Sequence, residues 1–172
     1  MRVDSPLLLR EATPADATAI GEVHAESWRV AHRDLFEPRL LRTLAEQRRT
    51  AWPAALTTRE NVRNTLLVAV RADRVEGFVH YGPHTEGPPD GEILNLYAHP
   101  TVWGSGIATH LVERAWELMR DAGHPSVRLW TMYGGNRARH FYASFGFRES
   151  GRLRDVDYGD GRPVLEVEYE LR

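Results

Sequence analysis

The segment LYAHPTVWGSGIATHLVERAWELMRDAG, residues 96–123, determines which fold this chain can adopt. Its pattern predicts a strand, then a short turn that carries Gly104 and Gly106, then a long amphipathic helix. A helix that begins directly after a glycine turn has several backbone N–H groups with no partner inside the helix. These groups and the helix dipole together form a site for a phosphate or pyrophosphate. Because the turn contains no Lys, Arg or Asp, we expect its backbone to do most of the anion binding.

The residues after the turn distinguish among the nucleotide-type cofactors that such a turn could bind. A P-loop requires Lys-Ser or Lys-Thr after the second glycine, whereas Ile107 and Ala108 stand there. A dinucleotide-binding turn requires a third Gly or Ala and an acidic residue at the end of the next strand. Thr109 occupies the third position, and the next strand, residues 127–131, continues into Met132, so that pattern matches weakly. The third alternative is the pyrophosphate of coenzyme A.

The segment NRARHFYASFGF, residues 136–147, supports the third alternative. WGSGIATHL followed by RARHFYASFGF, with one strand between them, resembles the GNAT superfamily of acyl-CoA-dependent N-acetyltransferases. In that family the pattern Arg/Gln-x-x-Gly-x-Gly/Ala begins the cofactor helix, and it corresponds here to residues 103–108. The segment ATPADATAIGEVHAESWRVAHRDLF, residues 12–36, also looks like the first helices of bacterial members. The resemblance therefore covers nearly the whole chain.

The resemblance implies an α/β fold, the GNAT fold. Its mixed central β-sheet of about six to seven strands is flanked by helices and split between the fourth and fifth strands. Residues 1–172 are expected to form a single domain that uses acetyl-CoA as co-substrate. The strand before the turn would supply backbone contacts to the pantetheine arm. The implied cofactor-binding residues are Leu96, Tyr97, Ala98, Trp103, Gly104, Ser105, Gly106, Ile107, Ala108 and Asn136.

The chain departs from the family pattern at two positions. Trp103 replaces the usual Arg or Gln, so a phosphate-facing side chain is lost while the backbone amides remain. Asn136 is followed directly by Arg137, one residue closer to Tyr142 than in the usual pattern, and Gly135 takes the usual Asn position. Whether Asn136 contacts the cofactor is therefore left open. Arg137 is either solvated or close to the cofactor phosphates.

The chemistry of acetyl transfer requires a base and an acid. An acceptor ammonium, whose pKa is ~10.4, must lose a proton before it attacks. Glu92 is the first candidate for this base, directly or through water, and His80 and His84 are next. The departing thiolate, whose acid has a pKa of about 8.5, gains from a proton. The resemblance implies Tyr142 as the donor of that proton, although a tyrosine among phenylalanines also suits a core.

Two further expectations concern the path of the acyl group. The resemblance implies that a backbone N–H near Tyr97 or Ala98 stabilises the thioester oxygen as it becomes negative. The chain contains no cysteine that could carry the acyl group. We therefore expect the amine to attack directly in a ternary complex.

The acceptor is expected on the side formed by the N-terminal helices and the loop after the third strand. Trp28, Tyr81 and His84 are the predicted substrate-binding residues there, beside Glu92. Aromatic rings with a carboxylate suit a cationic or partly apolar amine. The acceptor is thus a small-molecule or peptide amine. The alternatives are a protein N-terminus or lysine as acceptor, and a regulatory module that binds acyl-CoA without catalysis.

Composition limits the remaining classes of function. A net charge of −2 favours neither nucleic acid nor an acidic membrane as partner. No signal peptide or membrane-spanning run is apparent, so a cytoplasmic location is the default expectation. The eight histidines form no metal-binding pattern, so no metal is expected, and a homodimer is left open.

Periodicity predicts the other elements. A helix is expected after Thr13, and a second from Pro38 with an interruption at Pro53. At the C-terminus, residues 165–171 alternate apolar side chains with glutamates, which predicts a half-exposed strand. Further strands are expected at residues 7–10, 66–70, 75–81, 92–98 and 127–131.

Overall fold

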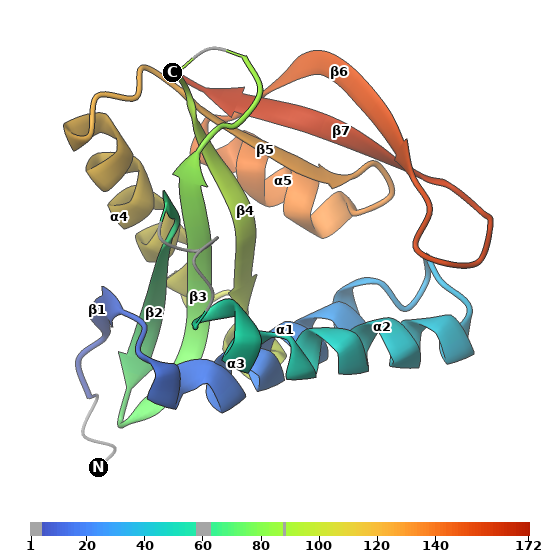
Figure 1. The fold of residues 1–172 in the computed structure, drawn as a ribbon, viewed down its shortest axis with the longest axis horizontal. Coiled ribbons are helices and arrows are strands. Elements are labelled where there is room, and N and C mark those ends of the chain that lie inside the picture. The colour runs from blue at the N-terminus through green and yellow to red at the C-terminus, as the bar shows by residue number, and fades with distance from the viewer. Residues whose placement is uncertain (1–4, 58–62, 88) are drawn as a thin grey trace.

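A seven-stranded mixed sheet forms the centre of the protein, as the computed structural model shows (Figure 1). The structure describes residues 5–57, 63–87 and 89–172. The sheet order is β1-β2-β3-β4-β5-β7-β6, and β4 and β5 are parallel while the other neighbours are antiparallel. This confirms the predicted fold class. The strands are β1 (Leu8–Glu11), β2 (Thr65–Arg71), β3 (Arg74–Pro83), β4 (Gly91–Ala98), β5 (Val127–Met132), β6 (Arg148–Val156) and β7 (Val164–Leu171).

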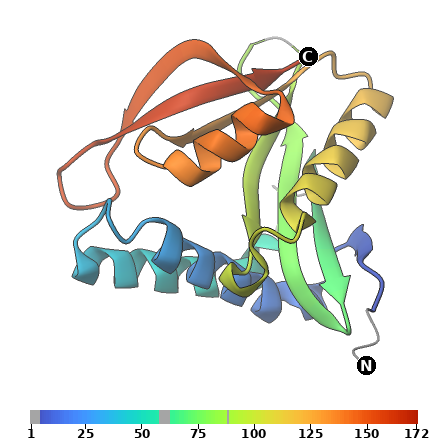
Figure 2. The same cartoon turned by 180° about the vertical axis from the view of Figure 1, so that it is seen from behind.

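Helices cover the sheet from both sides. Figures 1 and 2 show the N-terminal helices on one side, and α4 with α5 on the other. The largest core cluster lies between the sheet and α4, with Leu111 and Val79 fully buried in it. A second cluster joins Phe78 to Trp52 under α1. The helices are α1 (Ala17–Ala31), α2 (Pro38–Thr50), α3 (Trp52–Ala55), α4 (Ile107–Asp121) and α5 (Asn136–Phe145), with short 3₁₀ turns η1 (Pro14–Asp16) and η3 (Pro100–Val102).

The N-terminal helical segments begin where the sequence predicts, after Thr13 and at Pro38. The side chain of Asp16 caps the backbone N–H of Thr13 at 2.7 Å and pairs with Arg10 at 2.8 Å. The predicted interruption near Pro53 is present, because α2 ends at Thr50 and Pro53 lies in the first turn of α3. Proline is tolerated in a first turn because that backbone N–H needs no helical partner. Along the described ranges, no helix is both long enough and apolar enough to cross a bilayer.

The parallel strands β4 and β5 separate soon after they meet. They pair only from Gly91 to Ile93, opposite Val127 to Leu129, whereas β3 and β4 pair over most of their length. The predicted split between the fourth and fifth strands is therefore present. The β3–β4 register then steps from Tyr81↔Ile93 to His80↔Asn95, so Leu94 has no partner on β3. This extra residue is a β-bulge at the point where the split begins.

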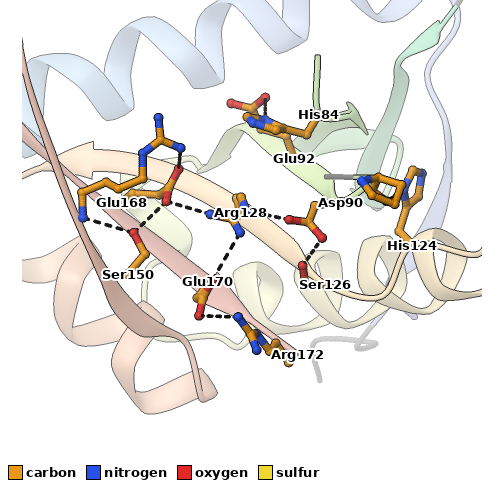
Figure 3. A network of polar contacts seen from close by, with 12 residues as sticks. His84, Asp90, Glu92, His124, Ser126, Arg128, Ser150, Glu168, Glu170 and Arg172 are labelled. Atoms are coloured by element: carbon orange, nitrogen blue, oxygen red, sulfur yellow. Dashed lines mark hydrogen bonds and ion pairs between the residues drawn. The ribbon is translucent and has the colours of Figure 1, made fainter. Parts of the chain in front are cut away.

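A network of charged side chains holds the closed end of the split together (Figure 3). Arg128 on β5 donates to Asp90 at 2.6 Å and to Glu168 on β7 at 3.0 Å. Glu168 is fully buried and also accepts from Ser150 and Arg152 on β6. The network therefore connects the start of β4 to the three C-terminal strands and fixes where the split begins.

The C-terminal strand differs from its predicted half-exposed state. Val167 and Tyr169 are buried as the alternation predicts, but Glu166 and Glu168 are buried too, at 6% and 0% exposure. The reason is that Arg128, Arg152 and Arg154 cover this face of the sheet and pair with the carboxylates. The sequence analysis also missed β6, whose mostly exposed residues show no alternating apolar pattern.

Candidate active site

A single cavity of about 1100 Å³ passes through the split in the sheet. We call one end the glycine end; it is formed by Trp103, Gly104, Gly106, Ile107 and Asn136, beside α4 and α5 (Figure 2). The other is the aromatic end, under α1 and α2 and beside the β6–β7 connection. It is formed by His24, Trp28, His32, Arg48, Tyr97 and Tyr158. The second half of β4 lies between the two ends.

The glycine end is an open helix N-terminus. Gly106, the residue before α4, has φ 86°, and Gly104 has φ 82°, so both lie in the left-handed region that favours glycine. A Cβ at Gly104 would meet nothing within 4 Å, and one at Gly106 would meet only His110 Nε2 at 4.0 Å. No described side chain caps the helix, so its first N–H groups are open to a ligand. These residues fit a pyrophosphate held by backbone amides.

Ser105 lies outside the cavity, unlike the other predicted turn residues. Its backbone N–H donates to the carbonyl oxygen of Val102 at 3.2 Å, and its side chain is exposed. The lining includes Trp103, Gly104 and Gly106 but not Ser105. The cofactor contact of Ser105 stays a prediction, and the tight turn directs this residue away from the cavity lining.

Trp103 and Arg137 form a pair across the mouth of the glycine end. The indole Nε1 of Trp103 donates to the carbonyl oxygen of Ala98 at 2.8 Å, which fixes the ring. The guanidinium carbon of Arg137, on the first turn of α5, lies 4.2 Å from the ring centroid. Both residues line the cavity. A positive charge therefore stands over the position at which the GNAT pattern has Arg or Gln.

The second half of β4 turns part of its backbone into the split. His99 N–H bonds to Glu76 O on β3 at 2.8 Å. Hydrogen-bonded and non-bonded pairs alternate along an antiparallel ladder. Tyr97 therefore bonds to β3, while the backbone groups of Leu96 and Ala98 point away from it. The prediction of backbone contacts fits Leu96 and Ala98 but not Tyr97, whose role here lies in its side chain.

The carbonyl oxygen of Ala98 and the ring of Tyr97 join β4 to α1. Ser27 Oγ donates to Ala98 O at 2.8 Å, and Trp28 Nε1 donates to Tyr97 Oη at 2.9 Å. The ring of Tyr97 also packs against the ring of His24, with the two centroids 4.5 Å apart. These contacts fix the position of α1 beside the split.

Leu94 is a cavity residue that the sequence analysis missed. It is 42% exposed and lines the cavity at the bulge. A bulge leaves the backbone of its extra residue unpaired, so an N–H donor is available here. The sequence contains no signal for it, because Leu94 fits the apolar pattern of an ordinary strand.

Tyr142 lies in the middle of the cavity wall on α5. It is 8% exposed and packs against Phe141, Phe147 and Tyr169. Its hydroxyl hydrogen-bonds to none of the described residues. Burial raises the pKa of Tyr142 above its ordinary value of 10.0, so the hydroxyl stays protonated at neutral pH. Asn136, at the start of α5, is exposed and also lines the cavity.

Glu92 lies at the closed end of the split and lines the cavity. Its carboxylate is 3.1 Å from Nδ1 of His84, which lies off the lining (Figure 3). Tyr81 is 5% exposed and belongs to the core cluster that packs on α4, so it cannot contact a bound acceptor. His80 packs edge-on against Trp52 and does not line the cavity. The structure therefore keeps Glu92 as the candidate base and removes Tyr81 and His84 as acceptor contacts.

Trp28 is the centre of the aromatic end. Its ring stacks on the ring of Phe36, with the two centroids 5.7 Å apart. The guanidinium carbon of Arg48 lies 3.3 Å from the centroid of the Trp28 ring. Burial and the nearby Arg48 charge lower the pKa of His24 to about 3 and that of His32 to about 4, so both are neutral at neutral pH. Of this end, the sequence analysis found only Trp28 as an acceptor contact. The described residues contain no group of three or more His, Asp or Glu that could hold a metal ion.

Comparison with known proteins agrees with this geometry. A model of the acetyltransferase (GNAT) family matches residues 21–147. Aminoglycoside N(6')-acetyltransferase type 1 of Stenotrophomonas maltophilia is 29% identical over 84% of this chain and 88% of that protein. Mycothiol acetyltransferase of Brachybacterium faecium is 33% identical over 55% of this chain, a match that spans only 30% of that relative.

Solved structures share the fold. The PaiA N-acetyltransferase of Thermoplasma acidophilum, in complex with coenzyme A, has a TM-score of 0.74 at 19% identity and covers 95% of this chain and 98% of that one. The match of the family model extends over well more than half of the sequence, from α1 to the end of the α5 segment. The chain belongs to the acetyltransferase (GNAT) family, a family of acyltransferases that use acetyl-CoA as co-substrate.

Proposed function

We propose that the protein transfers an acetyl group from acetyl-CoA to a primary amine by direct attack in a ternary complex. One observation carries this proposal. A single cavity joins an open helix N-terminus to a buried tyrosine hydroxyl and a carboxylate through the split of the sheet. Acetyl-CoA supplies an activated acyl group and a thiolate leaving group when it is bound.

The glycine end would hold the cofactor. The free N–H groups at the start of α4 suit the pyrophosphate, and Arg137 on Trp103 adds a cation at the same mouth. The backbone of Leu96 and the N–H of Ala98 suit hydrogen bonds to the amides of the pantetheine arm, whereas the Ala98 carbonyl oxygen already accepts from Ser27 and Trp103. The contact of Asn136 with the cofactor stays a prediction.

Three groups of this chain would serve the reaction. Glu92 takes a proton from the acceptor ammonium, directly or through water. The unpaired backbone N–H at the Leu94 bulge, or that of Ala98, donates to the oxygen that becomes negative during transfer. Tyr142 donates its proton to the departing thiolate.

The test is release of free thiol from acetyl-CoA in the presence of single amines, amino acids and short peptides. Steady-state lines should intersect, and mass spectrometry should show no acetyl group on the protein incubated with acetyl-CoA alone. Binding of acetyl-CoA without thiol release from any amine would contradict the proposal and favour a binding module. A kinetically competent acetyl-enzyme would contradict direct attack.

Tyr142→Phe keeps the ring and removes only the proton donor. We expect kcat to fall by ~10²–10⁴, the usual contribution of general acid catalysis, while acetyl-CoA affinity stays the same. Tyr133→Phe is the matched control, because Tyr133 is 48% exposed and does not line the cavity. An unchanged kcat in Tyr142→Phe, with chemistry rather than product release limiting the wild type, would assign Tyr142 to the core alone.

A further inference from the structure

Two neighbouring arginines of α2 have opposite environments. Arg49 pairs with three carboxylates on the outer side, those of Glu22, Glu26 and Glu46. Arg48 lines the cavity instead, and no carboxylate of the described residues lies within ion-pairing distance of its guanidinium. Its one hydrogen bond to a described residue is from Nη1 to the carbonyl oxygen of Leu44 at 3.0 Å. Most N–H groups of this guanidinium therefore have no acceptor among the residues that the structure describes.

The position of Arg48 is costly without an anion. Its guanidinium carbon lies over Trp28, 3.3 Å from the ring centroid, and burial lowers the pKa of Arg48 from the ordinary value of 12.5. An arginine nevertheless stays charged at neutral pH. A partly buried charge with no partner is unfavourable, so a fold that retains one gains stability when an anion binds.

The other polar groups near Arg48 also have unused capacity. Tyr97 Oη accepts from Trp28, so its own proton remains available for donation. Nδ1 of His32 is buried and has no hydrogen-bond partner within residues 5–57, 63–87 and 89–172. The carboxylate of Glu166 is already paired with Arg154 at 2.7 Å and also accepts from the hydroxyl of Tyr158 at 2.5 Å. Among the described residues, the aromatic end thus combines a free hydroxyl proton with a guanidinium that has no carboxylate within ion-pairing distance, while Asp34, also on the lining, pairs with Arg33 at 3.7 Å.

We propose that the acceptor carries an anionic oxyacid group, such as a carboxylate, beside its amine, and that Arg48 binds this group. The inference rests on the proposed function and specifies its substrate class. Arg48 would hold the anion at the aromatic end, while Glu92 would receive the ammonium at the closed end of the split. An acceptor with both an ammonium and an anionic group has one charge of the opposite sign for each of these two residues, whereas a polycation would be repelled by Arg48.

The wild-type protein tests this directly. Amino acids are compared with their amides and with the amines obtained by decarboxylation, in thiol release and in calorimetric binding to the protein saturated with coenzyme A. β-Alanine and aminoethylphosphonate, with propylamine as the neutral comparison, distinguish a carboxylate from a phosphonate. We expect anionic acceptors to bind and react at least about 10-fold better, as for a hydrogen bond to a charged group.

The Arg48→Met variant keeps much of the length of the side chain and removes the charge. We expect kcat/KM for anionic acceptors to fall about 10- to 100-fold, mainly through KM, with acetyl-CoA affinity unchanged. Arg48→Lys should restore part of the preference, and Arg49→Met is the matched control on the same helix. Melting curves show whether each variant is folded.

The outcomes separate this inference from the proposed function. If amines are acetylated without preference for an anionic group, or if no anionic amine binds to the coenzyme A complex, the assignment of Arg48 is wrong. Acetyl-CoA binding with no turnover of any amine would contradict the proposed function. In that case the preference for anionic amines in calorimetry still supports or overturns the assignment of Arg48.

Discussion

The two ends of the cavity are built in different ways. The glycine end is made by backbone groups and by residues close together in the sequence, Trp103 to Ile107. The start of α5, which follows the next strand, completes it. The aromatic end is made by side chains of α1 and α2 together with the β6–β7 connection. That connection lies more than 100 residues further along the sequence than either helix. Backbone geometry binds a ligand part that many proteins share, whereas side chains from distant segments can specialise for one acceptor.

The ends also differ in electrostatics. Near α4, the helix N-terminus supplies partial charges that need no titratable side chain. The aromatic end contains His24, His32 and Arg48, each desolvated and each with a lowered pKa. The comparison predicts that charge substitutions at the glycine end change the affinity for the cofactor. At the aromatic end, lowering the pH should protonate the buried histidines and reduce stability.

The largest effect is expected from Gly106→Glu. It places a negative side chain in front of the α4 N-terminus, and like charges in contact cost several kcal/mol. We expect acetyl-CoA affinity in calorimetry to fall by at least about 100-fold, or ~2.7 kcal/mol. Ser105→Glu is the matched control, because it adds the same charge one residue away but outside the cavity. Gly106→Ala measures the strain at φ 86° alone.

Equal losses in Gly106→Glu and Ser105→Glu would mean that charge near the turn acts nonspecifically. Native affinity in a folded Gly106→Glu would remove the pyrophosphate from this turn. Either result would end the contrast between the two ends.

An intermediate effect is expected on stability in acid. His32 has a folded-state pKa of about 4 against 6.5 when unfolded, so the unfolded state binds the proton more strongly. The contribution of His32 to stability is complete above pH 6.5 and is lost as pH falls toward 4. We expect the titration of His32 to lower the free energy of unfolding by about 2 kcal/mol by about pH 5. This would be measured as a lower midpoint of unfolding in urea.

His32→Phe keeps an aromatic ring against Trp28 and removes this titration. Its stability should decline less than that of the wild type between neutral pH and about pH 5. His24, whose pKa of about 3 is also lowered, still titrates in this variant. An identical decline in both proteins would show that His32 is not desolvated as the structure indicates.

The smallest effect is expected from Arg137→Gln. The arginine is exposed, so its attraction to Trp103 and to a nearby phosphate is worth about 1 kcal/mol. Acetyl-CoA affinity should weaken by about 3- to 10-fold, less at high salt, with the acceptor KM unchanged. Arg120→Gln is the control, because Arg120 lies over Trp116 at 5.6 Å on α4, outside the cavity. No difference between the two variants would place Arg137 in solvent.

The sequence by itself predicted the features that depend on near neighbours. The glycine turn before α4, the amphipathic helix after it, the helical start after Thr13 and the block around Tyr142 follow from local hydrogen bonding and periodicity. The mixed sheet and its split followed from the resemblance that these features carry. The positions of Glu92 and Trp28 on the cavity agree with the same analysis.

Only the tertiary structure decided which side chains meet across the split. It placed Tyr81 and His84 off the lining, buried Glu168 among arginines and produced the Leu94 bulge. It also left Arg48 without a carboxylate partner in the part of the chain that the structure describes. Strand register and the packing of α2 beside Trp28 set these outcomes. They depend on contacts between segments far apart in the chain, which local periodicity does not encode. The cofactor turn can therefore be found in the sequence, whereas the acceptor site exists only once α1, α2 and the C-terminal strands have come together.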